Sequence, residues 1–393
     1  MQLVPPEQWP DPHPLYHQMR SEEPYLHVPE LDEYVLTRHA DCERVLRDPK
    51  FSSNPSHRRA PPLESGSLRE RIAEEQPVNV LLFIDPPDHT RIRRLVSKAF
   101  TPRRVEELRE HISGLVTEML DEVGDEPFDV IARLAYPLPA TVICELMGVP
   151  VEDRDRFAPW SSAASRLLDL NISREEEMAG SVAFLQLLNY FNQLFDERRA
   201  EPRDDLVSAL LAAEEAGDRL GEEELRAITI LLFVAGHETT MNLIGNGLYA
   251  LLRHPGEMAR LREDPSLLPG AIEELLRWDG PVHLTGRVAT EEMVVGDITV
   301  EKGQQVVTLL AAANRDPAVF PDPDRLDVGR RDNHHLTFSH GIHYCLGAAL
   351  ARLEGQIAVG EVVRRLPGLE LAEEPEYREH FVLRGLRSLQ VAP

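Results

Sequence analysis

The sequence predicts a mainly α-helical protein with a small β-rich part. The strongest indication is residues 222–253, because the first half of this stretch is apolar on almost every side and must be buried within the protein. Residues 105–220 contain several segments with the amphipathic spacing of helices that cover a core. Short β-type segments occur near the N-terminus and again after residue 286, which predicts a minor sheet region.

The composition predicts one globular domain covering residues 1–393. A hydrophobic content of 42% is ample for a core, and no internal repeat or low-complexity linker divides the chain. The formal charge of −25 argues against nucleic-acid binding, which requires a basic surface. Three cysteines do not make a disulfide framework and favour a reducing compartment. No signal peptide or membrane-spanning run is recognised, so we expect a cytoplasmic protein without membrane contact.

The first ninety residues predict a short helix near residues 15–20, a strand pair and a second helix. The strands are expected over Tyr25–Val28 and Tyr34–Thr37, and the apolar spacing suits a helix over His39–Arg47. Residues 51–88 then lose any regular period, because prolines and a glycine interrupt them. Long irregular connections within compact domains tend to be functional.

The next predicted helix begins at residues 85–88, where its prolines are tolerated in a first turn. His89 and Arg93 stand four residues apart and therefore share a face of this helix. On a strongly acidic protein the same region forms a concentrated cationic patch, made of Arg91, Arg94, Lys98, Arg103 and Arg104. Further amphipathic helices over residues 157–170 and 179–195 do not identify a substrate.

Residues 236–240, Gly-His-Glu-Thr-Thr, interrupt the most apolar helix. A glycine inside a helix costs about 1 kcal/mol relative to alanine, and an interior carboxylate costs more unless it is hydrated or paired. A helix that accepts both is predicted to use them. Thr239 can donate a hydrogen bond to the carbonyl of Ala235, which would bend the helix. Glu238 is either a reactive carboxylate or a paired structural one, and His237 is expected to face elsewhere.

Glu274 and Arg277 lie three residues apart on one face of the following helix. A buried guanidinium beside a carboxylate makes a fixed fork. Strands are predicted over residues 287–290, 293–300 and 305–309, and a terminal hairpin over residues 381–391 is expected to turn at Gly385.

The clearest chemical signal is residues 338–347, in which Cys345 stands among glycines and histidines just before a long apolar helix. Free backbone N–H groups and a helix N-terminus both stabilise a thiolate. Gly341 and Gly347 let the backbone approach a flat ligand and the next helix closely. Cys42 and Cys144, by contrast, are expected to be small buried side chains. A zinc site is the alternative for the candidate ligands, which are His334, His335, His340, His343 and Cys345, but it lacks a second cysteine pair at metal spacing.

The pattern Phe-x-x-x-x-His-x-Cys-x-Gly resembles the haem-binding loop of the cytochrome P450 family, particularly its bacterial, ferredoxin-dependent members. The resemblance covers nearly the whole chain, because three further motifs occur in the family's order: His89/Arg93, Ala235–Thr240 and Glu274/Arg277. Ser339 stands where the family usually has glycine, and it is tolerated there if its φ angle is negative. The resemblance implies a helical prism with a small β-rich region, forming a single haem domain over residues 1–393 without a fused reductase.

The resemblance also implies a haem b cofactor whose iron takes Cys345 as its axial thiolate. His89, Arg93 and Arg287 would bind the two propionates, and His343 would be a further polar partner. Phe338 and Gly347 belong to the loop around the ligand.

For the oxygen chemistry, the resemblance implies that Ala235 and Gly236 border the O2 groove. Thr239 would steady the dioxygen, and Glu238 would feed protons through water. Glu274, Arg277 and Arg325 would form a structural triad. The candidate substrate-pocket residues are Leu81, Leu82, Leu231, Val234, Val282 and Leu284.

The implied activity is O2-dependent monooxygenation, by hydroxylation or epoxidation of an apolar small molecule, in secondary metabolism. Electrons derived from NAD(P)H would arrive through a ferredoxin reductase and a ferredoxin, and the ferredoxin would dock on the cationic patch. The alternative is that this patch is a solvated basic surface without a partner. Residues 51–88 would form a lid over the pocket. Two other functions stay open: a peroxide-driven peroxygenase, which typically lacks the Glu238/Thr239 pair, and a non-catalytic haem-binding protein.

Overall fold

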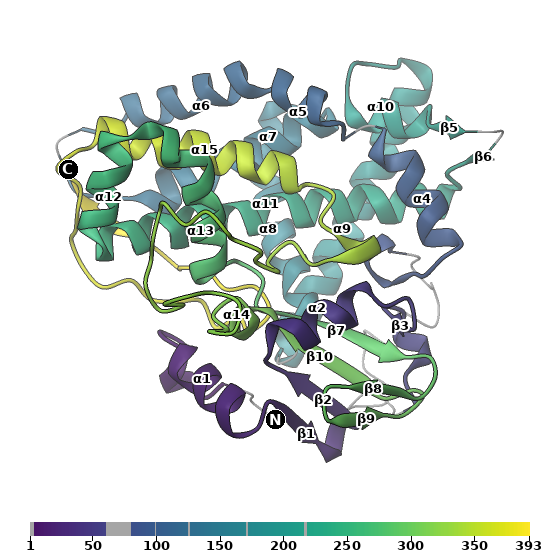
Figure 1. The fold of residues 1–393 in the computed structure, drawn as a ribbon. Helices are drawn as coiled ribbons and strands as arrows, with labels where there is room; N and C mark the ends of the chain where they lie inside the picture. The colour runs from purple at the N-terminus through teal and green to yellow at the C-terminus, as the bar shows by residue number, and fades with distance from the viewer. Residues whose placement is uncertain (1–3, 60–79, 99, 125, 170–171, 216–217) are drawn as a thin grey trace.

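Helices make up most of the computed structural model, which describes residues 4–59, 80–98, 100–124, 126–169, 172–215 and 218–393. Most of them occupy the upper part of the molecule in Figure 1, while α1 and α2 lie in the lower part with the main sheet. The helices are α1 (His13–Glu22), α2 (His39–Arg47), α4 (Asp88–Ser97), α5 (Pro102–Glu107), α6 (Arg109–Asp121), α7 (Pro137–Met147), α8 (Arg154–Ser165), α9 (Arg174–Ala200), α10 (Leu206–Leu211), α11 (Glu222–Arg253), α12 (Pro255–Glu263), α13 (Leu268–Asp279), α14 (Leu310–Ala313) and α15 (Ala348–Arg365).

The β region consists of small sheets built from short strands. The strands are β1 (Tyr25–Val28), β2 (Glu33–Leu36), β3 (Phe51–Ser52), β4 (Phe128–Asp129), β5 (Glu214–Glu215), β6 (Asp218–Arg219), β7 (Leu284–Ala289), β8 (Met293–Val295), β9 (Ile298–Val300), β10 (Gln305–Leu309), β11 (Glu370–Leu371) and β12 (Gln390–Ala392). The largest sheet has the order β1-β2-β10-β7-β3, in which β10 runs parallel to β2 and antiparallel to β7. Val307 at its centre lies opposite Val35 on one side and Gly286 on the other.

Helix α11 joins two hydrophobic cores. Its first half, including Ile228 and Phe233, packs with α8 and α9. Its second half, including Ile244 and Leu248, packs with α13 and α15. By length and composition α11 could cross a membrane, but 67% of its most apolar window is buried inside the protein, so it is the central helix of the core. The two cores meet near residues 235–240.

The predicted fold class is confirmed, and several elements have the predicted bounds, among them α2, β1 and β10. The predicted hairpin at Gly385 is wrong. Strand β12 pairs instead with β11 and β4, and residues 382–386 are linked to other parts of the chain by isolated bridges between Val282 and Leu383 and between Tyr377 and Leu386. The predicted lid falls largely on residues 60–79, which lie outside the described part of the chain.

Candidate active site

The loop that carries Cys345 is a tight turn braced by its own backbone. The Cys345 N–H donates to the carbonyl of Phe338 at 2.9 Å. Gly341 has a φ of 69°, and a Cβ there would lie 2.6 Å from the carbonyl oxygen of Leu46, so the close approach to α2 requires glycine. Ser339 has a φ of 61°, contrary to the expected negative angle. The serine therefore occupies the left-handed region at a cost of about 1 kcal/mol.

The sulfur of Cys345 sits at the start of α15 in a mixed electrostatic environment. The side chain is exposed, whereas Cys42 and Cys144 are buried as predicted. The protein around the sulfur keeps water away from it, and this desolvation raises the pKa of the Cys345 thiol. The opposite effect comes from the N–H groups of Gly347 and Ala348 and from the nearby Arg93 and Arg352. A Cβ on Gly347 would meet open space, so this position leaves room beside the sulfur for a flat group.

Four polar side chains gather next to this loop from three elements. Arg93 of α4 donates to the carbonyl of Tyr344 at 2.5 Å, and the ring centroids of His89 and His343 are 4.4 Å apart. Arg287 of β7 is 4% exposed, donates to the carbonyl of Gly286 at 2.7 Å, and acts with its charge on His343, as His89 and Arg93 do. The structure therefore brings together the four residues that the sequence analysis assigned to the propionates.

Among the described residues, Asp85 is a carboxylate whose charge acts on Arg287 and His89, and it does not offset the effect of their burial. Burial lowers the pKa of Arg287 to about 10. Burial, together with Arg287, His89 and Arg93, lowers the pKa of His343 to about 3. His89 is 1% exposed, and neither of its ring nitrogens has a hydrogen-bond partner among the described residues. A buried guanidinium and the orphaned ring nitrogens of His89 are stabilised by an anion, and haem propionates fit this need.

Helix α11 is continuous through its middle and has an exposed position at Ala235. Thr239 Oγ1 donates to the carbonyl of Ala235 at 2.7 Å, as expected from their spacing. Ala235 is exposed, although Val234 before it and His237 and Glu238 after it are buried. Gly236 packs against Ile143, whose Cδ1 would lie 3.1 Å from a Cβ at that position. His237 is buried against Tyr136, with ring centroids 4.9 Å apart.

Glu238 is buried and paired. It is 1% exposed, accepts a short hydrogen bond from Ser165, and lies 3.2 Å from Nη1 of Arg378 and 3.6 Å from Nδ1 of His380. Burial acts to raise the pKa of Glu238, but His380, Arg378 and Ser165 outweigh it, so that pKa lies below its usual value. These three partners escaped sequence reasoning because none forms a local motif with residue 238; the carboxylate in an apolar helix signalled only that partners must exist.

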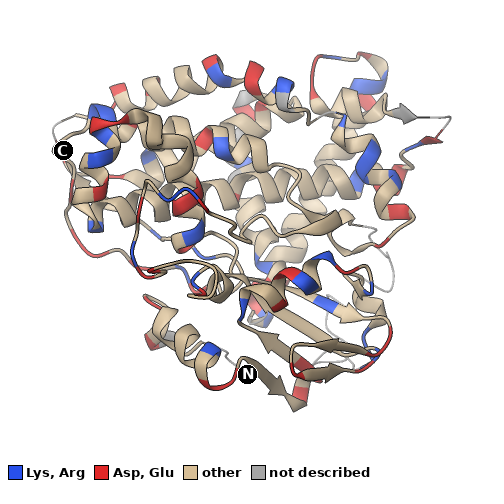
Figure 2. Ribbon diagram, in the orientation of Figure 1, with Lys and Arg blue, Asp and Glu red and all other residues tan. Residues whose placement is uncertain are grey.

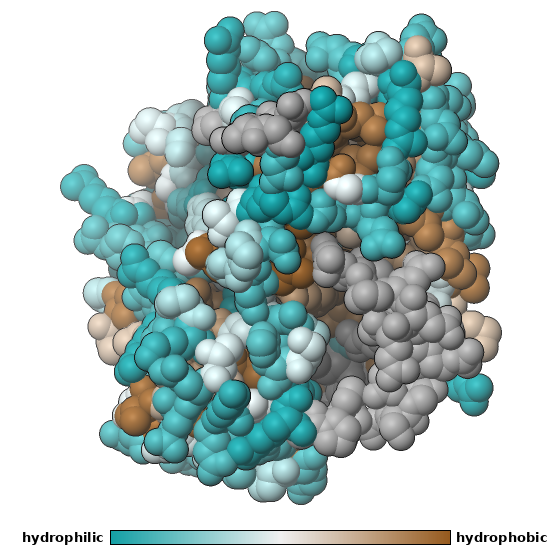
Figure 3. Space-filling view, turned by 90° about the vertical axis from the view of Figure 1, so that its right-hand side faces the viewer, coloured by the Kyte–Doolittle hydropathy of each residue, from teal (hydrophilic) through white to brown (hydrophobic). Residues whose placement is uncertain are grey.

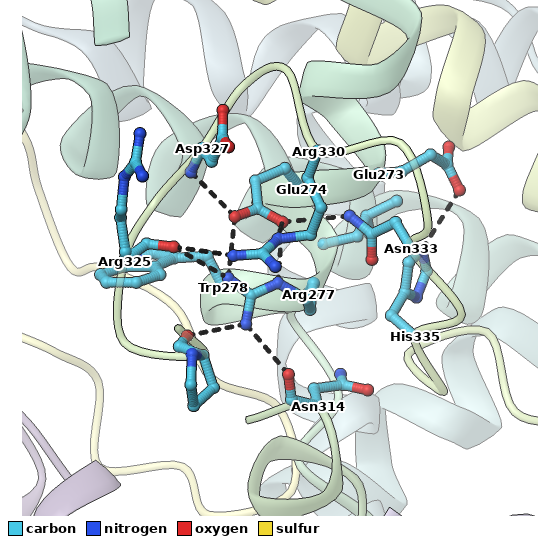
Figure 4. Close-up of polar contacts among 12 residues, drawn as sticks. Glu273, Glu274, Arg277, Trp278, Asn314, Arg325, Asp327, Arg330, Asn333 and His335 are labelled. Atoms are coloured by element: carbon cyan, nitrogen blue, oxygen red, sulfur yellow. Dashed lines mark hydrogen bonds and ion pairs between the residues drawn. The ribbon is translucent and has the colours of Figure 1, made fainter. Parts of the chain in front are cut away.

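The structural triad needs one correction, visible in Figure 4. Arg277 forms the predicted fork with Glu274, at 2.7 and 2.8 Å, and both side chains are fully buried. The third side chain is Arg330, whose Nε lies 3.0 Å from Glu274, and not Arg325. The Arg325 side chain is exposed, and only its backbone carbonyl accepts hydrogen bonds, from Arg277 and Arg330. Asn333 completes the set at 3.1 Å from Glu274.

The candidate pocket residues fall into separate groups. Leu81 and Val234 are buried in the same core as the first half of α11, and Leu231 and Leu346 pack against that core. Leu82 is half-buried on the short turn after residue 80. Val282 and Leu284 belong to two different cores on the sheet side. The structure thus places part of this set near the cysteine loop through Leu346.

The predicted cationic patch is partly neutralised. Arg91 contacts Glu224 and Asp218, and Arg103 contacts Glu107 at 3.1 Å. Basic and acidic residues consequently alternate around α4 and the β5–β6 hairpin at the right of Figure 2. On the molecular surface that faces the viewer in Figure 3, hydrophilic residues predominate and hydrophobic ones form scattered patches.

Comparison with known proteins gives consistent matches along the chain. Residues 165–380 match the family model described as Cytochrome P450. Vitamin D(3) 25-hydroxylase of Pseudonocardia autotrophica is 43% identical over 391 residues, which cover 98% of this chain and 94% of the relative. 6-Deoxyerythronolide B hydroxylase of Saccharopolyspora erythraea is 38% identical, covering 96% of this chain and 94% of its own. The ligand-free crystal structure of Mycobacterium smegmatis CYP164A2 is 42% identical and superposes with a TM-score of 0.91, covering 100% of this chain and 98% of its own.

Proposed function

This chain belongs to the cytochrome P450 family and is a haem-iron monooxygenase, and on that premise we propose that Cys345 is its thiolate ligand and that residues 1–393 form one haem domain. The observation that carries the proposal is the exposed Cys345 sulfur beside the buried Arg287 guanidinium and the buried His89 ring, whose nitrogens have no hydrogen-bond partner among the described residues. The arrangement supports a group that offers a metal to the sulfur and anions to Arg287 and its neighbours. Haem b has both.

The residues around the loop would hold the cofactor. His89, Arg93 and Arg287 would donate hydrogen bonds to the propionates. His343 lies between His89 and Ser53, and its Nε2 is 2.8 Å from the Oγ of Ser53. When bound, the haem iron supplies the activation of O2, which consumes two electrons and two protons for each oxygen atom inserted and yields one water. Phe338 and Gly347 would shape the protein surface beside the sulfur.

Helix α11 would leave room for O2 and supply protons to it through four residues, which are Ala235, Gly236, Glu238 and Thr239. The exposed Ala235 and the glycine beside it leave room for a small molecule next to the helix. Thr239 holds its proton toward the Ala235 carbonyl and would turn to donate it outward. Glu238 is held ionised by Arg378 and His380, so it can accept a proton from the side of the C-terminal segment and release it toward Thr239 through water.

We propose an apolar small molecule as substrate, hydroxylated or epoxidised in secondary metabolism. The relatives include Mycinamicin IV hydroxylase/epoxidase, and each of the two hydroxylases compared above acts on the molecule in its own name. Leu81, Leu231 and Val234 supply apolar surface near the loop. The electrons would come from NAD(P)H through a ferredoxin reductase and a ferredoxin in the cytoplasm, a compartment that suits three unpaired cysteines.

The ferrous carbonyl spectrum tests the ligand. The haem-loaded protein should show the far-red-shifted Soret band of a thiolate ligand, and Cys345→Ser should lose it. Cys42→Ser is the matched control, because Cys42 is buried near the sheet and its variant should keep the band. A colourless purified protein, or an unchanged Cys345→Ser spectrum, contradicts the proposal.

The threonine is tested separately. Thr239→Ala should retain the cofactor yet divert electrons from product to peroxide, measured as peroxide formed per NAD(P)H consumed. Thr229→Ala provides the control, since this buried hydroxyl of the same helix has no partner among the described residues. Unchanged coupling in Thr239→Ala refutes the role of Thr239.

A further inference from the structure

A second glutamate–arginine fork lies next to the structural triad but serves a different part of the protein. Glu273 of α13 accepts two hydrogen bonds from Arg352 of α15, from Nε at 2.7 Å and from Nη2 at 2.7 Å. Figure 4 shows Glu273 turned toward His335 and away from the neighbouring Glu274 cluster. The side chains of Glu273 and Arg352 are 25% and 29% exposed, so protein shields most of each charge.

Arg352 reaches from this fork to the cysteine loop. Its Nη1 donates to the hydroxyl of Tyr344 at 2.9 Å, and its guanidinium carbon lies 4.5 Å from the centroid of the Phe338 ring. Tyr344 directly precedes Cys345, and Phe338 accepts the hydrogen bond of the Cys345 N–H. The cationic end of the pair is thus fixed to both residues that hold the cysteine in place.

Glu273 supplies the opposite charge on the far side of Arg352. Burial acts to raise its pKa, but Arg352 and His335 outweigh it and bring that pKa to about 2. His335 Nε2 lies 3.2 Å from the Glu273 carboxylate, and its Nδ1 accepts the N–H of Thr337, so the imidazole donates through Nε2. Burial lowers the pKa of His335, although the neighbouring Glu273 acts in the opposite direction. The fork therefore holds one anion and one cation.

We propose that Glu273 and Arg352 are positioning residues that set the reduction potential of the iron group bound by Cys345. The inference rests on the proposed function of Cys345. Reduction adds one electron, delivered by the redox partner, to a centre that already carries a thiolate. A nearby cation stabilises the added charge, and an anion behind that cation offsets part of the effect. The fork holds Arg352 at one place and moderates its influence.

Charge removal separates the two contributions. Glu273→Gln leaves the cation without its counter-charge and should raise the reduction potential, whereas Arg352→Gln should lower it. The double variant removes both charges and should return close to the original potential. The measurement is a spectroelectrochemical titration of the haem-loaded protein at low ionic strength, where screening is weak. A merely structural fork predicts shifts of equal sign or none.

The same helix offers a matched control. Arg364 forms the same kind of fork with Glu361, at 3.2 and 2.6 Å, three turns farther from Cys345. Glu361→Gln and Arg364→Gln should leave the potential unchanged. Arg352→Lys retains the charge and should stay closer to the original potential than Arg352→Gln, so the comparison survives if one variant does not fold.

The outcomes separate this inference from the proposed function. If the protein without substitutions lacks the far-red-shifted Soret band of its ferrous carbonyl form, the assignment of Cys345 as thiolate ligand is refuted. A normal band combined with potentials that fail to move in opposite directions overturns the role of the Glu273–Arg352 fork alone.

Discussion

Glu354 of α15 offers a quantitative test of how this core is built. Its side chain is 1% exposed, and its Oε2 has no hydrogen-bond partner among the described residues. Burial raises the pKa of Glu354 to about 8, because a lone carboxylate is poorly solvated there. The folded protein therefore keeps this side chain protonated at neutral pH, and we predict that Glu354→Gln, which mimics the protonated form, stabilises the fold.

The size of the effect follows from proton linkage. Below pH 4.5, the ordinary value, the folded and unfolded states both hold the proton and Glu354 costs nothing. Between pH 4.5 and 8 only the unfolded state releases it, so the free energy of unfolding falls by about 1.4 kcal/mol per pH unit. The cost is about 1 kcal/mol at pH 5 and about 3 kcal/mol at pH 7, and it levels off above pH 8.

Urea unfolding of the original protein and Glu354→Gln from pH 5 to pH 8.5 measures this difference. Haem is kept in constant excess, so that cofactor release contributes equally to both proteins. The advantage of the variant should grow by roughly 2 kcal/mol between pH 5 and pH 7. Glu361→Gln, on the same helix, should change stability by less than about 1 kcal/mol without a pH trend. A pH-independent difference for Glu354→Gln would show that the carboxylate titrates normally and that its burial is wrongly assigned.

Two further substitutions test the corrected triad and the Glu238 pair. Arg330→Gln should lower the free energy of unfolding by about 2–4 kcal/mol, because it removes a charged partner of the buried Glu274. Arg325→Gln should change the free energy of unfolding by no more than about 0.5 kcal/mol. Urea unfolding measures both values, and equal losses would contradict the assignment of Arg330 to the triad. Arg378→Met removes a cation that lowers the pKa of Glu238, so that pKa should rise. The pH at which the coupling of NAD(P)H consumption to product formation changes should therefore move upward. An unchanged pH profile of coupling would show that Arg378 does not control this carboxylate.

The sequence predicted elements best where one local pattern decides the structure. Helix α2 has the predicted bounds because its apolar periodicity agrees with the face that it buries. Strand β10 has them because it is a short, mostly apolar run that is buried on both sides between β2 and β7. The hairpin prediction at Gly385 failed because a glycine can mark either a turn or a close contact between segments. A Cβ there would lie 1.9 Å from Oδ1 of Asn242, so this glycine permits the C-terminal segment to pack on α11 and does not form a hairpin turn. Only the tertiary structure separates a turn glycine from a contact glycine.

The same limit explains what was missed at the candidate site. The His89 and Arg93 spacing places both side chains on one face of a helix, and the structure accordingly brings them together near Cys345. Arg330 and Arg378 have no such signal. Each contacts a buried glutamate from a segment without regular periodicity. Several arginines occur in such segments, and the sequence alone does not indicate which of them contacts the glutamate. A buried carboxylate predicts that a partner exists, and the path of the chain decides which one it is.

The exposure of Ala235 follows from the way α11 is buried. Residues before Ala235 belong to the core with α8 and α9, and residues after Thr240 belong to the core with α13 and α15. A helix shared by two cores has its least constrained surface where they meet, so small residues can remain there without leaving a hole inside either core. Substitutions among the α8 and α9 side chains therefore change the space beside Ala235 without touching Glu273 or Glu274, which lie on α13 and anchor the cysteine side of the protein.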